Sequence, residues 1–500
     1  MFISYFLLPL LGLLTAIFIA SAFIEMYKDF RKTNNLTNPQ ILQREFDTKN
    51  KPVFQTKSKN QRVCQKDSLS GNEHKIFDDE MNAFDQSTTY RIKLFDINPP
   101  QSSTEIEELF VNREKDLEED VQYFHDAFRS SKINVICGSS RTGKSHYMKK
   151  LLLDLEKMNR PFWMKYINAN SKETVRYVLH KIFQKLKQGI NDLAVTTSRP
   201  DVKLVRSLSL DMNKLIDEKG SKTINPNNIK SFLLANKTPI SLPNFPDFIK
   251  TPIEFIMEGQ DCIFTRPEDS ELIEFIKFQA EYLIDISEGE YQSILLAIDD
   301  VDLLYLTEEG KKDVDYLYKL FGELAESNIV NILITTRRHS AIDRAKDFEF
   351  FREIGPLVVN DFTEIYRKRI QLYNQNQEVF TENALTYLIG CAQGKPGIFL
   401  NHCKKIFLNS SPPINREDIG KALKRILQDF RANDELKVYV DLITSAVLNT
   451  DDSEDSLTLS LPNSVCDTKL LFFAISQANQ SGEYEVNKLI KEYLESESKT

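Results

Sequence analysis

One octapeptide has the residue types and spacing of a phosphate-binding loop: Gly138-Ser139-Ser140-Arg141-Thr142-Gly143-Lys144-Ser145. The two glycines allow a tight backbone path, so that consecutive N–H groups can surround phosphate oxygens at a helix N-terminus. Lys144 can reach the β- and γ-phosphates, and the Ser145 hydroxyl can ligate Mg²⁺. A β-branched run precedes the loop and a helical apolar stripe follows it, which is the required context. We expect ATP and Mg²⁺ as ligands, with His146 on the helix beside the nucleotide.

A second candidate for phosphate chemistry is the apolar run Ile294–Ile298, which ends in Asp299 and Asp300. A carboxylate at the end of a buried strand can hold Mg²⁺ through water, which is the role expected for Asp299. Asp300 is then placed to orient or deprotonate an attacking water. The alternative is a buried strand whose acids only begin a loop.

The third candidate is the polar end of another apolar run, Thr335-Thr336-Arg337. A polar residue at the tip of a central strand can contact the γ-phosphate, and an arginine there can neutralise charge in the transition state. Arg337 is therefore a candidate catalytic residue. Arginine is usually exposed, so a solvated loop is the alternative interpretation.

Apolar runs alternate with helical patterns and predict an α/β fold, a parallel sheet with helices on both faces. Strands are expected at 132–137, 162–167, 293–298 and 330–335, with a fifth at 357–359, and a helix is expected over 106–128. The polar, proline-dotted stretch 189–269 is too long for a loop and indicates an insertion. The predicted organisation is an ATPase domain over 104–359, a helical lid over 360–435 and a small acidic domain over 436–500.

The N-terminus differs from the rest because Phe2 to Ile24 contains no charged side chain. As a helix this run would rise about 34 Å, enough to cross a bilayer. We predict a transmembrane anchor over 1–32, and a cleaved signal peptide is the alternative. The following Lys28, Arg31 and Lys32 place the bulk of the chain in the cytoplasm. An organelle inner membrane is the alternative location. Residues 33–103 are expected to be a flexible linker, with a local strand at 90–95.

The composition limits the other classes of function. The net charge of -9 does not suit a protein that coats nucleic acid. Six cysteines without a C-x-x-C pair, and six histidines without metal spacing, argue against zinc and disulfide frameworks.

With these motifs in place, the segment Phe110–Leu117 resembles the nucleotide-binding box of STAND and archaeal-type ATPases and of the origin-recognition branch of AAA+ proteins. Asn112 stands where that box has glycine, and Asp116 stands where it has glutamate. The resemblance implies that Val111, Asn112 and Arg113 border the adenine.

Further segments resemble the same family in its order along the chain. Asp299-Asp300 is similar to its paired-acid Walker B, and Thr335–Arg337 to the TTR motif of NB-ARC domains. Ile354–Leu357 resembles the entry to a helical lid, and Gly394–Gly397 its G-x-P element, which implies that Pro396 lies beside the nucleotide.

The tail resembles a winged-helix domain, with helices expected at 470–477 and 486–494 and no room for a wing. Residues 436–500 contain 5 lysines against 11 acids, which would repel phosphate. Nucleic acid is therefore not an expected partner, whereas an unknown protein or a second copy of the chain is.

The leading hypothesis is a membrane-anchored ATPase that acts as a nucleotide-dependent switch or remodelling factor. Asp300 is shorter than a glutamate and could position water poorly, so a non-hydrolysing, ATP-bound membrane scaffold is one alternative. A nucleic-acid-linked ATPase similar to origin-recognition proteins is another.

Overall fold

The computed structural model describes residues 93–126, 133–158, 162–169, 174–195, 199–217, 220–235, 243–301, 308–337, 348–374, 378–449, 457–460, 472–476 and 483–498. The predicted anchor, 1–32, and the linker up to residue 92 lie outside this part of the chain. Within the described ranges no helix is long and apolar enough to cross a membrane.

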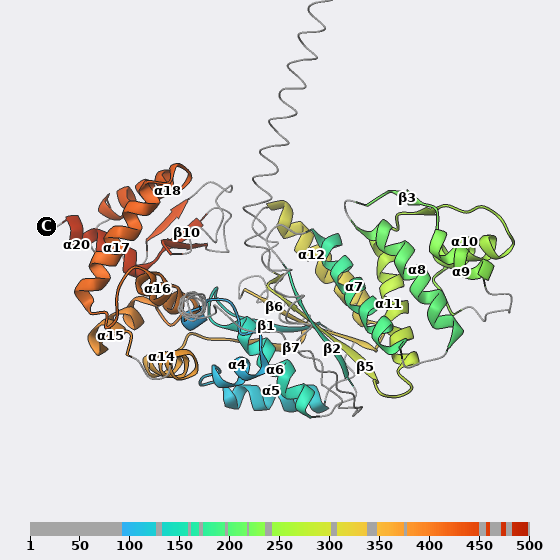
Figure 1. The fold of residues 1–500 in the computed structure, drawn as a ribbon, viewed down its shortest axis with the longest axis horizontal. Helices are drawn as coiled ribbons and strands as arrows, with labels where there is room; N and C mark the ends of the chain where they lie inside the picture. The colour runs from blue at the N-terminus through green and yellow to red at the C-terminus, as the bar shows by residue number, and fades with distance from the viewer. Residues whose placement is uncertain are drawn as a thin grey trace, which may run out of the picture. The chain divides into compact units, whose positions relative to one another are not determined.

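A five-stranded parallel sheet forms the centre of the fold (Figure 1). Its strands, in chain order, are β1 (Ile133–Cys137), β2 (Phe162–Asn168), β5 (Ser293–Asp299), β6 (Val330–Thr336) and β7 (Phe348–Glu353). In space they follow the order β2-β5-β6-β1-β7. β1, β5 and β6 are buried along their whole length, as expected for apolar strands covered on both faces. The predicted α/β class is confirmed.

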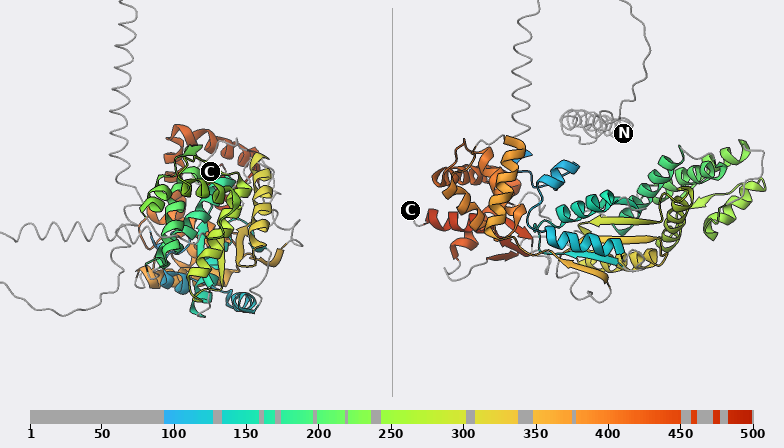
Figure 2. Two further views of the ribbon diagram at one scale, coloured as in Figure 1. Left: turned by 90° about the vertical axis from the view of Figure 1, so that its right-hand side faces the viewer. Right: turned by 90° about the horizontal axis from the view of Figure 1, so that it is seen from below.

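Helices cover both faces of the sheet (Figure 2). On one face, α5 (Glu114–Asp126) and α6 (Lys144–Lys157) share a core with alternate residues of the strands. On the other, α7 (Val175–Leu193), α11 (Asp269–Ile286) and α12 (Glu308–Ala325) pack on the opposite set. Successive strand side chains point to opposite faces, so each strand contributes to both cores.

Two expected elements differ in the structure. The fifth strand is Phe348–Glu353, and 357–359 instead leads from the sheet into a helix. β7 is an edge strand with several half-exposed residues, so it lacks the uniform apolar run of the inner strands. The helix expected over 106–128 is divided into α4 (Ser103–Glu108) and α5, because Asn112 between them adopts a left-handed conformation.

The stretch 189–269 is a folded helical insertion. It comprises the end of α7, then α8 (Pro200–Ile216), α9 (Asn227–Ala235) and α10 (Asp247–Met257), with a two-stranded ribbon of β3 (Thr223–Ile224) and β4 (Phe264–Thr265). Its buried residues are continuous with the core beneath α7 and α11.

Beyond the sheet, the region predicted to be a lid forms four helices, called the lid helices below: α14 (Val359–Asn374), α15 (Glu382–Cys391), α16 (Pro396–Leu408) and α17 (Arg416–Arg431). The end of the predicted linker packs into their core, where Leu94 and Phe95 are buried. Lys93 and Leu94 are helical, not part of the strand expected at 90–95.

The C-terminal unit contains α18 (Asp434–Asn449), β8 (Thr458–Ser460), β9 (Ala474–Ser476), β10 (Glu483–Val486) and α20 (Lys488–Ser498). The helix expected at 470–477 is wrong, because Ala474–Ser476 is a strand. Where no wing was expected, β9 and β10 pair antiparallel, and β10 lies between β8 and β9.

Candidate functional site

The predicted phosphate loop leaves β1 at Cys137 and enters α6 at Lys144. Gly143 precedes the first turn of α6 with a φ of 97°, a conformation that favours glycine. A Cβ on Gly138 would lie 2.5 Å from the carbonyl oxygen of Ile354, so only glycine fits there. Both loop glycines are thus required by the backbone path, and the path brings Ser139–Ser145 to the N-terminus of a helix.

Lys144 is buried within this loop, with only 6% of its surface exposed. Its ammonium donates to the carbonyl oxygens of Gly138 at 3.2 Å and Ser139 at 3.1 Å. Carbonyl dipoles alone compensate a buried cation incompletely, so the lysine suits an anion at the mouth of the loop. Thr142 stabilises the loop by donating its hydroxyl to Ser139 O at 2.9 Å. The loop therefore fits a polyphosphate.

The segment before α5 is tied to the loop by Arg113. Its guanidinium donates to the carbonyl oxygens of Thr142 at 2.9 Å and Gly355 at 2.8 Å. Burial lowers the pKa of Arg113 to about 10, which leaves the side chain cationic at neutral pH. Arg113 thus joins the phosphate loop to the start of the lid, and the neighbouring Val111 packs against the lid core.

Asn112, which stands where the resembled nucleotide-binding box has glycine, adopts a backbone conformation that glycine would also allow. Its φ is 52°, in the left-handed region that asparagine tolerates better than most residues. Its side-chain amide donates at 2.5 Å to Asp361, whose other carboxylate oxygen accepts from the backbone N–H of Val358. Asparagine therefore preserves the turn and adds a contact with the first lid helix.

We predict that Asn112→Ala destabilises the protein more than Asn112→Gly does. Both substitutions remove the hydrogen bond to Asp361, but only alanine must be forced into the left-handed region, at a cost of about 1–2 kcal/mol. Thermal unfolding of the two variants measures this difference directly. Equal melting temperatures would show that the conformation of residue 112 does not limit stability.

His146 lies on α6 and contacts α4 and the segment that follows it. Its Nε2 donates to the carbonyl oxygen of Ile106 at 3.0 Å, and its ring packs edge-on against Phe110 at 5.5 Å between centroids. Burial lowers the pKa of His146 to about 4, so the ring is neutral at pH 7. The structure gives His146 a role in packing α4 and the box against α6.

The predicted magnesium carboxylate, Asp299, is buried at the end of β5 with 1% exposure. One of its oxygens accepts from the Thr335 hydroxyl and the other from the Tyr166 hydroxyl. The Thr335 hydroxyl also accepts from the backbone N–H of Asp300 at 2.8 Å. Three neighbouring strands thus hold this carboxylate in one orientation. A carboxylate is an oxygen ligand, the kind that Mg²⁺ prefers.

Asp300 follows β5 with a φ of 59°, so the chain turns sharply at this residue. This left-handed conformation is tolerated by aspartate and directs the residue out of the strand that fixes Asp299. The paired acids therefore have separate environments, one buried and hydrogen-bonded within the sheet and the other at the strand end.

Arg337 leaves the sheet beside the phosphate loop. Thr336 pairs with Cys137 in the ladder between β6 and β1, so Arg337 and Gly138 come directly after paired positions. Arg337 is 7% exposed, which excludes the solvated-loop alternative. Its cation is therefore held inside the fold at the carboxyl edge of the strands.

The lid contacts the phosphate loop through the predicted G-x-P element. The backbone N–H of Gly397 donates to Arg141 O at 3.1 Å, and a Cβ on Gly397 would lie 3.0 Å from the Arg141 side chain. Pro396 begins α16, is buried, and lies 3.9 Å from where a Cβ of Gly143 would be. The element thus packs directly on the loop.

Two functional side chains escaped the sequence reasoning. Tyr166 lies on β2 and was given no role, although its hydroxyl fixes Asp299. Asp361 was also missed, although it accepts from Asn112 and from the Val358 backbone. A lone tyrosine in a strand and an acid in the first turn of a helix are ordinary structural residues, so neither carried a recognisable signal.

The five-stranded parallel sheet and the loop at the N-terminus of α6 form an α/β fold that is consistent with a P-loop NTPase. Two strands flank β1, and β6 separates it from the strand that carries Asp299.

Comparisons with known proteins add distant structural neighbours. No family model and no curated protein sequence matches the chain. Among solved structures, the Aeropyrum pernix Orc1 protein in complex with DNA is 12% identical, covers 79% of this chain and 94% of its own, and has a TM-score of 0.37. The Walker-type ATPase PABY2304 of Pyrococcus abyssi is 13% identical, covers 80% of this chain and 99% of its own, and has a TM-score of 0.35. Domain III of the Thermotoga maritima replication initiation protein DnaA is 12% identical, covers 65% of this chain and 98% of its own, and has a TM-score of 0.31.

Proposed function

We propose that the protein is an ATPase of AAA+ type that binds ATP and Mg²⁺ between the sheet and the helical lid. The observation that carries this proposal is the buried Lys144 ammonium on the phosphate loop, at the same sheet edge as the buried Asp299. Lys144, the loop N–H groups and Ser145 would hold the phosphates and the metal. Bound Mg²⁺ would neutralise phosphate charge during transfer to water. Asp300 is the proposed base, and Arg337 the proposed stabiliser of transition-state charge.

The contacts between lid and loop support a nucleotide-dependent switch. Gly397 contacts Arg141 of the loop, and Lys395, two residues earlier, forms an ion pair of 3.2 Å with Glu485 on β10. A change at the phosphates can therefore be passed through two neighbouring residues of one lid turn to the C-terminal unit. Switches commonly act by such closure of a lid on a bound nucleotide. The effector that responds to this change is proposed to be a protein partner or a second copy of the chain.

A nucleic-acid-linked ATPase is the second candidate. The C-terminal sheet has its last strand, β10, in the middle, and this arrangement resembles that of a winged-helix domain. The acid excess of residues 436–500 weighs against phosphate binding by this unit. Stimulation of phosphate release by DNA, lost steeply as salt is raised, would favour this candidate over a protein-directed switch.

The proposal predicts Mg²⁺-dependent phosphate release from ATP by the full-length protein. We expect release to stop when EDTA removes Mg²⁺, because the phosphate charge is then no longer neutralised. The mass of the protein, measured in detergent to accommodate the predicted membrane anchor, should also differ with and without ATP and Mg²⁺. ATP binding without release or change in mass would support the static scaffold instead.

A further inference from the structure

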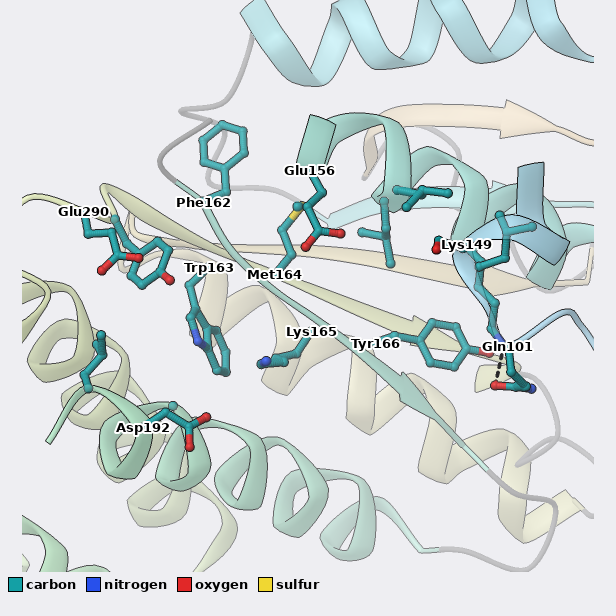
Figure 3. A pocket seen from close by; sticks show the side chains of 17 residues that line it. Gln101, Lys149, Glu156, Phe162, Trp163, Met164, Lys165, Tyr166, Asp192 and Glu290 are labelled. Carbon is teal, nitrogen blue, oxygen red and sulfur yellow. Dashed lines mark hydrogen bonds between the residues drawn. The ribbon is translucent and has the colours of Figure 1, made fainter. Parts of the chain in front are cut away.

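Lys149 of α6 lies at one end of a groove beside β2, together with Gln101 and Tyr166 (Figure 3). It follows Ser145 of the phosphate loop by four residues on the same helix, so the two residues share one face of α6. The Lys149 ammonium lies 4.9 Å from the centroid of the Tyr166 ring. A cation over an aromatic face is attracted by the ring, and the lysine therefore restrains Tyr166.

Tyr166 links this lysine to the predicted magnesium carboxylate. Its hydroxyl donates to Asp299 on the neighbouring strand β5. A cation over the ring polarises the phenol, which makes the hydroxyl a stronger donor. Burial lowers the pKa of Lys149, and the charge of Asp299 opposes this shift. Lys149 and Asp299 are thus coupled through Tyr166 and also directly through their charges.

Residues 93–101, termed the strap, hold Lys149 from the side of the preceding chain. The ammonium donates to the carbonyl oxygen of Pro100 at 3.0 Å and to Oε1 of Gln101 at 3.2 Å. Pro99 and Pro100 have φ angles fixed by their rings, so this part of the strap is stiff. The strap therefore fixes the position of the cation over the tyrosine.

The other end of the strap is anchored in the lid helices. Phe95 is fully buried, and its ring centroid lies 5.7 Å from those of Phe380 and Phe407. Arg369 of α14 is buried and donates to the carbonyl oxygen of Leu94 at 3.1 Å. Without the strap this buried cation would lose that acceptor, which is costly. A movement of the lid relative to the sheet must therefore pull on the strap or break these contacts.

We propose that Lys149 is a positioning residue of the ATP site, which orients Asp299 through Tyr166, and that the strap couples it to the position of the lid. The inference rests on the proposed function, in which Asp299 is a ligand of Mg²⁺. Movement of the lid away from the sheet would draw the strap and the lysine off the ring, and Asp299 would be held less firmly. Coupling between two sites is reciprocal, so ATP with Mg²⁺ must in turn stabilise the strap.

The positioning role is tested with the full-length protein in detergent, by calorimetric titration of ATP in Mg²⁺ and in EDTA. The ratio of the two dissociation constants measures the contribution of the metal to binding. We expect Lys149→Met to lower this ratio by roughly 3- to 10-fold, because the cation over the ring is lost. ATP affinity in EDTA should stay normal. Lys149→Arg should restore the ratio, since a guanidinium also stacks on aromatic rings and donates to carbonyl oxygens.

The matched control is Lys150→Met, which removes the same charge from the next residue of α6. Lys150 pairs locally with Asp154, so the ratio should not change. Tyr166→Phe tests the link itself and should lower the ratio by about 10- to 100-fold, the usual loss for a side chain that orients a metal ligand. In that background Lys149→Met should have a much smaller further effect, because the hydroxyl through which it acts is absent.

The coupling to the lid is tested by hydrogen exchange, which does not depend on hydrolysis. We expect ATP with Mg²⁺ to slow exchange of the strap amides in the unmodified protein, because a strap held at both ends opens less often. The slowing should be smaller in Lys149→Met. Lys150→Met should behave like the unmodified protein.

Four results would overturn the inference. An unchanged ratio in Lys149→Met, while the unmodified protein binds ATP, would exclude Lys149 as a positioning residue and leave the proposed function intact. Equal losses of affinity in Mg²⁺ and in EDTA would show that Lys149 only stabilises the fold. Strap exchange that ignores ATP and Mg²⁺ would exclude the coupling. An unmodified protein that binds no ATP in either condition would overturn the proposed function itself, and the inference with it.

Discussion

Replacing Lys144 by alanine is expected to weaken ATP binding by roughly 10- to 100-fold, since hydrogen bonds to charged groups contribute about 1.5–3 kcal/mol. Lys144 is 6% exposed, and in the described part of the chain its ammonium donates to the carbonyl oxygens of Gly138 and Ser139 alone. An incoming phosphate would gain a charge-assisted contact without displacing an ion pair. Isothermal titration calorimetry with ATP and Mg²⁺ measures the loss.

The matched control is Lys150→Ala, on the same helix. Lys150 forms a local pair with Asp154 at 2.5 Å, four residues further along α6. Such helix pairs contribute only about 0.3–0.5 kcal/mol, so this variant should bind ATP almost normally. Unchanged affinity in Lys144→Ala, with a normal thermal transition, would rule out the phosphate loop as the nucleotide site.

The elements around the predicted phosphate loop were the most predictable from sequence. β1, α6 and β5 have uniform apolar runs or a clear helical stripe, and the loop glycines are required by local backbone geometry. The signals for these elements are contained in a few consecutive residues. Their physical causes, burial on both faces and a tight turn, act over the same short range.

Features that depend on partners distant in the chain were not predictable in this way. β7 is a strand because it pairs with β1, more than 200 residues earlier, while its own sequence alternates between buried and exposed positions. Tyr166 acquires its role only when β2 is placed beside β5, where its hydroxyl meets Asp299.

Asp300→Asn is expected to slow phosphate release by about 100- to 10,000-fold, the usual contribution of a general base. ATP affinity should change little, because the amide has the shape of the carboxylate and leaves Asp299 untouched. Asparagine also tolerates the φ of 59° at this position, so the backbone turn is retained. Phosphate release under single-turnover conditions separates the chemical step from product release.

Asp429→Asn, an exposed change on α17, is the control for the loss of one negative charge. Unaltered phosphate release by Asp300→Asn would exclude this residue as the base.

Asp299→Asn should behave differently from Asp300→Asn, and the comparison assigns the two acids. Both oxygens of Asp299 accept hydrogen bonds, from Thr335 and from Tyr166. An asparagine would place an NH₂ group against one of these hydroxyls, and that hydroxyl would lose its acceptor in a buried site. We therefore expect Asp299→Asn to lower the melting temperature and to weaken the Mg²⁺ dependence of ATP binding. Asp300→Asn should leave both unchanged. Identical behaviour of the two variants would mean that the acids act as one unit, and would contradict separate metal and base roles.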